Sequence, residues 1–383
     1  MKNFTKKEIL YWSPSLSKVG TINAVMNSVI GIKKYSNKYN SSIIDACGEW
    51  ENLKKNKKIS FIKLYKKRYF NFLPKGGYFK SRFSYLMIFV FSFLPLLKCI
   101  KKRKPEFMII HLITSLPLIY LIFFKLQTKI ILRISGLPKI VFFRKFLWKF
   151  ISKKIFLVTC PTESTLTYLK KNKIFPKNKL KLLYDPFINP DEIKNKLKEK
   201  IIYDKYNKYI ISIGRLTRQK NFTLLINSFE VISKYFKNLN LKIIGEGEQR
   251  KILEKMIVEK DLTKRVFLLG FKKNIYKYLN QAECFLLSSL WEDPGAVLVE
   301  AAALGKNIIS SDCDNGPKEI LNNGKNGFLF KNNDKKDLIK KFFLFKQSSL
   351  KVKKNMIRKL KKKSELYTIK NHSKLLIRYL NEN

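Results

Sequence analysis

Residues 284–311 read CFLLSSLWEDPGAVLVEAAALGKNIISS. The apolar run at 284–287 ends in two serines, a pattern typical of a buried parallel strand that reaches its carboxyl end. A turn follows at 292–295, and residues 296–304 are then apolar at every position except Glu300. Because a helix that is apolar on all sides is a buried helix, the stretch predicts a strand, a turn and a buried helix of an α/β protein.

Two carboxylates belong to this unit, Glu292 on the turn and Glu300 on the helix. In open α/β sheets ligands bind outside the carboxyl ends of the strands, where Glu292 is expected. A buried carboxylate such as Glu300 requires a hydrogen-bond partner to offset its lost hydration. Carboxylates only accept hydrogen bonds, so two of them suit a ligand rich in hydroxyls, such as a sugar or a ribose. The alternative is structural: Glu292 caps the helix, and Glu300 pairs with a buried Arg or Lys.

A second unit, residues 209–230, reads YIISIGRLTRQKNFTLLINSFE. An apolar strand ends at Gly214, Arg215 and Lys220 follow on a loop, and a helix begins near Asn221, a good N-cap residue. Glycine lets the backbone approach a ligand, and helix amides together with two cations attract phosphate. The unit therefore predicts an anion site, although cations near a helix start also arise by chance in a chain with 79 Lys and Arg.

Four motifs follow one another between residues 209 and 330. They are IGRLTRQKN, IIGEGEQRKILE, the two glutamates with seven residues between them, and SSDCDNGPKEILNNGKNGFLF. Together they resemble the nucleotide-sugar half of retaining GT-B glycosyltransferases of family four, also called glycosyltransferase group 1. The resemblance is closest to the bacterial enzymes that build lipopolysaccharide O-antigen, capsule and related surface glycans. It covers the amino-terminal half only in outline.

The resemblance implies an α/β fold of the GT-B type, in which two Rossmann-like doubly wound domains face each other across a cleft. It implies an acceptor-binding domain at 1–190, a linker at 191–207, a nucleotide-sugar-binding domain at 208–365, and a last helix at 366–383 that crosses back to the first domain. The alternation of apolar strands and helices in the second half itself predicts a parallel, doubly wound sheet.

The resemblance also implies roles for individual residues. The residues implied to be catalytic are Arg215, Lys220 and Glu292. Those implied to bind the donor are Gly20, Gly214, Arg215, Lys220, Gly295, Ala296 and Glu300. His111, which follows a predicted strand, is a candidate for the acceptor site or a structural histidine. Two positions depart from the family pattern: Ser135 stands where the family often has histidine, and Asp293 and Pro294 precede Gly295, where a glycine usually follows the glutamate directly.

In function, the resemblance implies transfer of a sugar from a nucleoside diphosphate sugar to a lipid-linked or glycan acceptor, with the anomeric configuration retained. Arg215, Lys220 and helix amides would stabilise the negative charge that grows on the departing diphosphate. That phosphate would also accept the acceptor's proton, so we expect neither a cofactor nor a metal. The donor sugar, the base and the oligomeric state are left open.

The composition favours anionic partners, because the formal net charge of the 383 residues is +51. Five scattered cysteines without CxxC spacing predict reduced thiols in the cytoplasm, and the first residues lack the apolar core of a signal peptide. Residues 56–104 are basic and aromatic, a pattern that fits a peripheral membrane anchor, an RNA-binding surface or an ordinary solvated helix face. Because the resemblance implies a lipid-linked acceptor, we expect a peripheral anchor on the inner face of the cytoplasmic membrane. Within residues 56–104 the apolar stretch 85–97 is too short to cross a membrane, and 107–124 reads as a strand, a turn and a helix.

Three rival interpretations remain open. Asp312 and Asp314 spell a DxD motif, with which a metal-dependent glycosyltransferase could hold a divalent ion. A basic RNA- or membrane-binding protein without catalysis also fits the charge, although the sequence has no zinc spacing or RNA-recognition signature, and we expect no nucleic-acid partner. A phosphorylase or epimerase would share the crevice. Residues 367–380 predict an amphipathic last helix with His372 exposed.

Overall fold

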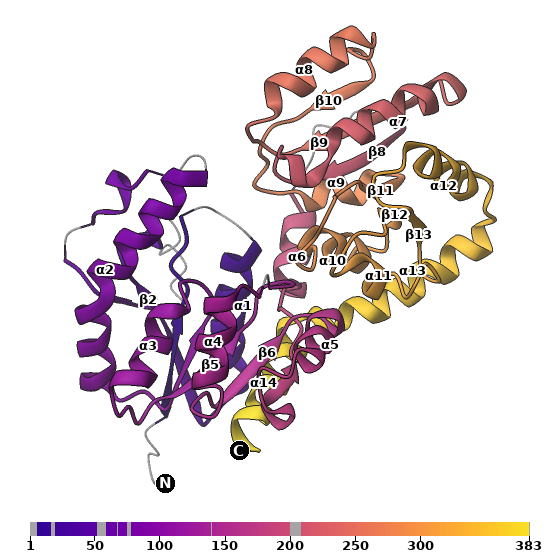
Figure 1. The fold of residues 1–383 in the computed structure, drawn as a ribbon. Helices are drawn as coiled ribbons and strands as arrows, with labels where there is room; N and C mark the ends of the chain where they lie inside the picture. Colours follow the sequence, from indigo (N-terminus) through magenta and orange to yellow (C-terminus); the bar gives the residue numbers. More distant parts are fainter. Residues whose placement is uncertain are drawn as a thin grey trace. The chain divides into compact units, whose positions relative to one another are not determined.

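The computed structural model describes residues 6–16, 20–51, 59–66, 68–74, 78–138, 140–199 and 208–382. The chain divides into two compact units (Figure 1). The first comprises Met1–Phe187 together with Ile369–Asn383, and the second comprises Ile188–Thr368. Each unit consists of one parallel sheet with helices, so the predicted α/β class with two Rossmann-like domains is confirmed.

The sheet of the first unit has seven parallel strands in the order β3-β2-β1-β4-β5-β6-β7. The strands are β1 Lys7–Trp12, β2 Tyr39–Asp45, β3 Ser60–Lys63, β4 Phe107–Ile110, β5 Lys129–Arg133, β6 Leu157–Cys160 and β7 Leu180–Leu182. In the register, Tyr11 of β1 lies between Ile43 of β2 and Ile109 of β4. The order along the sheet reverses at this point, between β1 and β4, which is where doubly wound sheets bind ligands.

Helices cover both faces of this sheet because successive side chains of a strand point to opposite faces. They are α1 Gly20–Tyr35, α2 Tyr78–Arg103, α3 Ser115–Phe123, α4 Phe142–Ile151, α5 Glu163–Lys171 and α14 Ile369–Asn381. Ile9 and Tyr11 belong to a core cluster shared with α1 and α14. Leu10 and Trp12 belong to the opposite cluster, shared with α2, α3, α4 and α5.

The sheet of the second unit has six parallel strands in the order β10-β9-β8-β11-β12-β13. The strands are β8 Lys208–Ile213, β9 Leu239–Ile244, β10 Val266–Leu268, β11 Cys284–Leu287, β12 Asn307–Ser311 and β13 Phe328–Phe330. The helices are α6 Pro190–Leu197, α7 Phe222–Tyr235, α8 Arg250–Glu259, α9 Tyr276–Gln281, α10 Ala296–Ala303, α11 Pro317–Ile320, α12 Lys335–Gln347 and α13 Leu350–Ser364. The order again reverses in the middle, between β8 and β11, and the two motif-bearing loops follow these two strands.

Three details differ from the sequence predictions. The segment 191–207, predicted as a linker, contains most of α6, which packs against α9 of the second unit; residues 200–207 lie outside the described part of the chain. The stretch 85–97 is not an isolated short run but the middle of α2, whose residues Phe79–Arg103 are long and apolar enough to cross a membrane by length and composition alone. About one third of the apolar segment of this helix is buried in the unit.

His372, predicted to be exposed, is buried, because the apolar face of α14 that carries it packs against α1. One ring nitrogen, Nε2, lies 2.8 Å from Ser28 Oγ, and Nδ1 lies 2.7 Å from the carbonyl oxygen of Tyr184. The last helix of the chain is therefore held in the first unit by polar contacts as well as by apolar packing.

Gly31 of α1 packs closely against α14. A Cβ atom there would lie 2.0 Å from Ser373 Oγ and 2.7 Å from Ile369 Cγ2. We expect Gly31→Ala to lower the free energy of unfolding by about 1–3 kcal/mol through overpacking, although alanine favours a helix over glycine by about 1 kcal/mol. Urea denaturation of the full chain measures the loss.

A second substitution distinguishes this clash from other causes. Ser373 Oγ is buried without a hydrogen-bond partner among the described residues, so Ser373→Ala alone should change stability little. Combined with Gly31→Ala it removes the shortest contact and should restore part of the lost stability. Equal stability of Gly31→Ala and the wild type would contradict the close packing.

Candidate active site

The loop after β8 and the loop after β9 pack backbone to backbone in the second unit. The amide of Gly214 donates to the carbonyl of Ile244 at 3.0 Å, and the amide of Leu216 donates to the carbonyl of Glu246 at 2.9 Å. A Cβ on Gly245, whose φ is +150°, would lie 1.8 Å from the carbonyl oxygen of Gly214. Gly245 and Gly247 of IIGEGEQR are therefore needed for the contact between the two loops.

Lys220 and Glu292 form a largely buried ion pair, with Lys220 Nζ 2.5 Å from Glu292 Oε1. Ser289, directly after β11, donates its hydroxyl to the same oxygen at 2.5 Å. A Cβ on Gly214 would lie 3.1 Å from three carbons of the Lys220 side chain, so the glycine leaves room for the lysine. Glu292 Oε2 has no hydrogen-bond partner among the described residues, which leaves it free to accept from a ligand.

The turn between Glu292 and α10 is fixed by the neighbouring loop after β12. The amide of Glu292 donates to the carbonyl of Asp314 at 3.2 Å, and Asn315 Nδ2 donates to Asp293 Oδ1 at 3.3 Å. The Asp293–Pro294 peptide is cis, and Gly295 has a φ of +99°. Helix α10 begins at Ala296, so its first amides have no acceptor within the helix and can bind an anion.

Glu300 lies one turn further along α10 and accepts a hydrogen bond from the hydroxyl of Tyr276 at 2.9 Å. Burial raises the pKa of Glu300 to about 7, against the opposing effects of the Tyr276 hydrogen bond and the charge of Lys196. The polar partner that the sequence required is thus a tyrosine of α9, and not a buried Arg or Lys. Tyr276 stands too far away in the sequence for any local pattern to have revealed it.

Arg215 is exposed on the loop after β8 and forms no ion pair with the carboxylates of the described residues. The structure therefore brings Gly214, Lys220, Glu292 and Gly295 together at the carboxyl edge of the sheet, beside the first amide of α10. No described contact joins Arg215 or Glu300 to this group. Ser289 and Asn315, which the sequence analysis did not single out, complete it.

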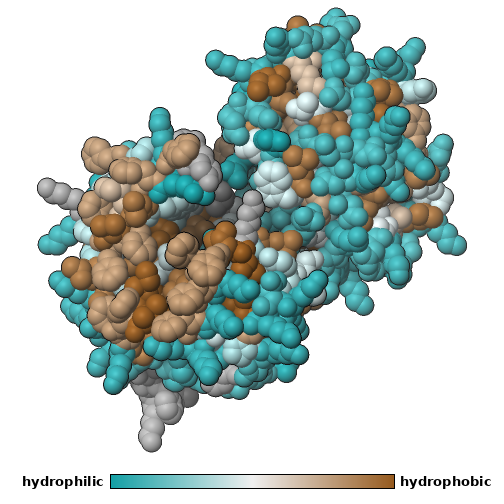
Figure 2. Space-filling view, in the orientation of Figure 1, coloured by the Kyte–Doolittle hydropathy of each residue, from teal (hydrophilic) through white to brown (hydrophobic). Residues whose placement is uncertain are grey.

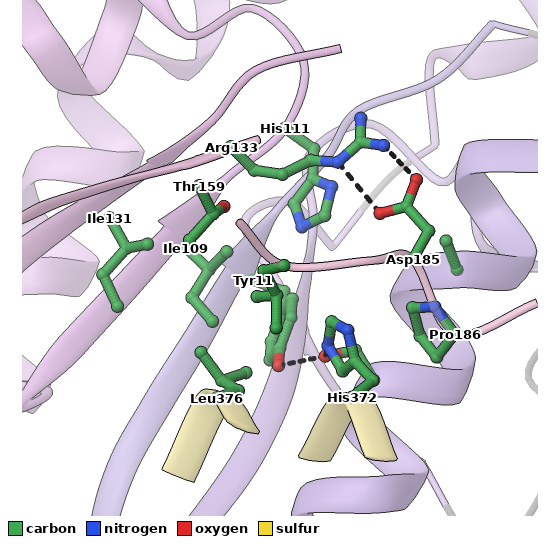
Figure 3. Close-up of a pocket in the computed structure, with 13 residues that line it drawn as sticks. Tyr11, Ile109, His111, Ile131, Arg133, Thr159, Asp185, Pro186, His372 and Leu376 are labelled. Carbon is green, nitrogen blue, oxygen red and sulfur yellow. Dashed lines mark hydrogen bonds and ion pairs between the residues drawn. The ribbon is translucent and has the colours of Figure 1, made fainter. Parts of the chain in front are cut away.

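His111 and Gly20, the remaining predicted site residues, belong to the first unit. His111 follows β4 and lies in a small cavity inside the unit (Figure 3). Neither ring nitrogen has a hydrogen-bond partner among the described residues. Burial, followed by the charges of Arg133 and His372, lowers the pKa of His111 well below its usual value, so the ring is neutral. Gly20 is exposed at the start of α1, next to residues 17–19, which lie outside the described part.

A buried ion pair borders the same cavity. Arg133, the last residue of β5, donates through Nε to Asp185 Oδ1 at 3.1 Å and through Nη2 to Asp185 Oδ2. Arg133 also donates to the hydroxyl of Ser135 at 2.6 Å, the position where histidine is common in the resembled family. Each nitrogen of this guanidinium thus donates one hydrogen bond within the unit.

The two aspartates of the DxD motif each make another contact. Lys318 Nζ lies 3.4 Å from Asp312 Oδ2, and the main chain of Asp314 pairs with that of Trp291. Among the residues that the structure describes, no three His, Cys, Asp or Glu side chains gather in a way that could hold a metal ion. Turn geometry after β12 accounts for the motif.

Known proteins resemble this chain in sequence. The model of the family Glycosyl transferases group 1 matches residues 193–363. The uncharacterized glycosyltransferase MJ1059 of Methanocaldococcus jannaschii is 32% identical over 246 residues, 59% of this chain and 60% of that protein. The N-acetylgalactosamine-N,N'-diacetylbacillosaminyl-diphospho-undecaprenol 4-alpha-N-acetylgalactosaminyltransferase of Campylobacter jejuni is 29% identical over 211 residues, 53% of this chain and 56% of that enzyme. The chain thus spans somewhat more than half the length of these relatives.

The fold has a counterpart among solved structures. Anabaena HepE in complex with UDP-glucose matches 98% of this chain and 100% of its own, with a TM-score of 0.73 and 16% identity. The two chains therefore share the GT-B fold. Residues 193–363, which match the model of Glycosyl transferases group 1, make up most of the second unit and contain the Lys220–Glu292 pair, so the resemblance to this family lies in the domain that carries the candidate site.

Proposed function

We propose that this chain transfers a sugar from a nucleoside diphosphate sugar to a hydroxyl of a lipid-linked glycan, with retention, during synthesis of a cell-surface polysaccharide or lipopolysaccharide. The observation that carries the proposal is the Lys220–Glu292–Ser289 cluster beside the first amides of α10. It offers groups for an anion and a free carboxylate oxygen for hydroxyls side by side. The lipid-linked acceptor is supported by the undecaprenol substrate in the name of the Campylobacter relative.

The donor diphosphate is the group that the cations and amides suit. Lys220 has three N–H donors and uses one on Glu292, so the other two are free for phosphate oxygens. Arg215, which no described carboxylate neutralises, supplies a second full charge, and the amides that begin α10 add a third set of donors. Interactions that strengthen as charge moves onto the leaving diphosphate lower the barrier for breaking the sugar–phosphate bond.

The sugar and the ribose are the groups that the two glutamates suit. Glu292 Oε2 can accept a hydrogen bond from a hydroxyl of the transferred sugar and so orient its anomeric carbon. Glu300, held by Tyr276, can accept from the ribose hydroxyls once it is ionised. A single ion pair thus contacts both sides of the bond that breaks, through Lys220 on the phosphate and Glu292 on the sugar.

The proposed reaction needs no protein base. The bond between the anomeric carbon and the phosphate oxygen breaks, a bond from the acceptor oxygen forms on the same face, and the acceptor proton passes to the departing phosphate. The neutral ring of His111, enclosed in the first unit, takes no part in this scheme. We place the reaction in the cytoplasm, which suits the five free thiols.

Arg215 gives the first test. Arg215→Ala should lower kcat at saturating donor by about 10²–10³-fold, the loss typical of removing one preorganised charge from a transition state. Arg218, an exposed cation on the same loop, provides the matched control, and Arg218→Ala should retain activity within a few-fold. Turnover of Arg215→Ala within tenfold of the wild type, or an equal loss in both variants, would refute the charge-stabilising role.

The raised pKa of Glu300 gives a pH prediction. Only the ionised form accepts hydrogen bonds from ribose at both oxygens, so affinity for UDP-glucose should increase as pH rises through about 7. UDP-glucose is suitable because its phosphodiester groups do not titrate there. Calorimetry between pH 6 and 8 should show weaker, pH-independent binding for Glu300→Gln. A pH dependence that persists in this variant would assign it to another group.

The raised pKa of Glu300 also affects the stability of the free protein, which should change with pH in the opposite direction to the affinity for UDP-glucose. Because the pKa of Glu300 is above its ordinary value of 4.5, the folded state binds the proton more tightly than the unfolded state. The contribution of Glu300 to stability should therefore fall as pH rises from about 4.5 through about 7, and Glu300→Gln should abolish this part of the slope in urea denaturation.

Chelation tests the expected independence from metal. We expect sugar transfer to survive excess EDTA, and Asp312→Asn to retain activity because its carboxylate pairs with Lys318. Activity lost in EDTA and restored by Mg²⁺ or Mn²⁺ would instead favour a metal-dependent transfer.

A further inference from the structure

Helix α2 is anchored in the first unit along one of its faces. Ser84, Ile88, Leu96 and Ile100 are buried on this face. Pro95 has no N–H for the carbonyl of Phe91, and the hydroxyl of Tyr65 donates to that carbonyl instead, at 2.5 Å.

A second hydroxyl holds the same helix, because Tyr120 of α3 donates to the carbonyl of Phe93 at 2.5 Å. These bonds and the buried face make α2 part of the core of the unit, so it cannot cross a membrane without dismantling that core.

The opposite face of α2 is apolar and exposed. Its exposed large side chains recur every three or four residues and so form one stripe: Phe79, Phe83, Leu86, Val90 and Leu94. Phe79 is 83% exposed and Leu94 is 60% exposed. A stripe of this length on a monomeric surface marks an interaction site.

Helix α4 presents a second exposed apolar face, with side chains from Phe142, Phe143, Phe146 and Phe150. Phe142 is 78% exposed and Phe143 is 82% exposed, whereas Trp148 and Ile151 hold the helix in the core. Helix α3 contacts both α2 and α4, and hydrophobic residues gather on this side of the first unit (Figure 2). Among the described residues of the unit, every exposed large hydrophobic side chain lies between positions 72 and 150. We refer to the exposed large hydrophobic residues of α2 and α4 as the aromatic face.

The part of the sequence that contains the aromatic face is strongly basic. Residues 52–162 contain 25 Lys and Arg but a single acidic residue, Glu106, which pairs with Lys7 and Lys129. Arg144, Lys145 and Lys149 are exposed on α4 itself. A second copy of this chain would bring the same positive charges to a shared interface, whereas an anionic surface would neutralise them.

We propose that the aromatic face docks on a bilayer that contains anionic lipids. The phenyl rings and the aliphatic side chains of α2 enter the boundary between headgroups and acyl chains, and the Lys and Arg side chains contact lipid phosphates. Both helices lie along the surface, and α2 does not span it. Leu86, Val90 and Leu94 favour lipid over RNA as the occupant, because an aliphatic side chain offers no ring on which a base can stack but loses its contact with water in lipid. The inference goes beyond the proposed sugar transfer and does not depend on it.

Vesicle flotation of the full chain tests the proposal, with phosphatidylcholine vesicles compared with mixed phosphatidylcholine and phosphatidylglycerol vesicles. We expect binding to the anionic vesicles only, reduced by salt. Each phenyl group removed from lipid should weaken partitioning about tenfold, so the triple variant F142S/F143S/F146S should lose nearly all binding. Phe271→Ser, which removes a ring that is 68% exposed in the second unit, should bind like the wild type.

Charge is tested with a matched pair of variants. R144Q/K145Q/K149Q removes three cations of α4, and each should weaken binding to anionic vesicles about fivefold. K351Q/K354Q/K359Q removes three exposed cations of α13 in the second unit and should have little effect. Equal losses in both triple variants would show a general attraction of a basic protein, and would overturn the docking face.

Fluorescence quenching locates the surface without loss of binding. A tryptophan placed at Phe83 or at Phe143 should be quenched by brominated lipids above the wild-type background, and one at Phe271 should not. UDP-glucose binding measured in vesicle-free solution should be the same in the α4 variants as in the wild type. An affinity for UDP-glucose equal to that of the wild type would show that these variants are folded. A loss of vesicle binding in them would then concern the aromatic face and not the proposed sugar transfer.

Three results would overturn the inference. Retention of the protein in membranes after an alkaline carbonate wash would show that α2 spans the bilayer. If the wild-type protein does not bind vesicles but forms a dimer, and the variant F142S/F143S/F146S is a monomer, the aromatic face would be an interface between two copies of the chain. Absence of vesicle binding together with salt-sensitive RNA binding lost in the same variant would assign it to nucleic acid.

Discussion

The buried pair of Lys220 and Glu292 is the interaction on which the candidate site depends. A carboxylate removed from water is strongly destabilising unless it is paired and hydrogen-bonded, and Glu292 obtains both partners at one oxygen, from Lys220 and Ser289. These residues come from the ends of β8 and β11, the strands at which the sheet order reverses. The amide of Glu292 also bonds the loop after β12. Satisfying one charge therefore fixes three loops relative to one another, and the second carboxylate oxygen is left for a ligand.

The first unit contains a comparable pair, but in a different state. Arg133 and Asp185 bond to each other through two contacts, and Ser135 occupies a further donor of the arginine. His372 of α14 lies near them and bonds to α1 and to the segment after β7. Here the charged pair is buried in the interior of the unit, and His372 holds the last helix of the chain. The two ion pairs thus differ in one respect. Both carboxylate oxygens of Asp185 accept hydrogen bonds from Arg133, whereas Glu292 keeps one oxygen free for a ligand.

The sequence predicted the parts of the fold that local patterns encode and missed the parts set by distant contacts. Apolar runs followed by glycine or serine predicted the central strands, whereas β3 and β13, which lie at the edges of the two sheets, were not predicted. The pattern of 296–304 showed that Glu300 needs a partner, yet Tyr276 is brought to it only by the packing of α9. The apolar run 85–97 is shorter than α2, because basic residues at both ends of the helix interrupt the apolar pattern.

The distribution of acidic residues separates the roles of the two units more clearly than the basic residues do. The first unit contains 41 Lys and Arg with 8 Asp and Glu, and the second contains 38 Lys and Arg with 20 Asp and Glu. A general preference for lysine would add cations to both units alike, and their numbers are indeed similar. It would not remove acids from one of them.

In the second unit carboxylates pair with cations, as Glu292 does, and form directed contacts suited to one small ligand. In the first unit the 41 cations far outnumber the 8 acids, so a net positive charge remains over the unit. Such a charge attracts an extended anion and not a single phosphate, because it is spread over helices without a common focus.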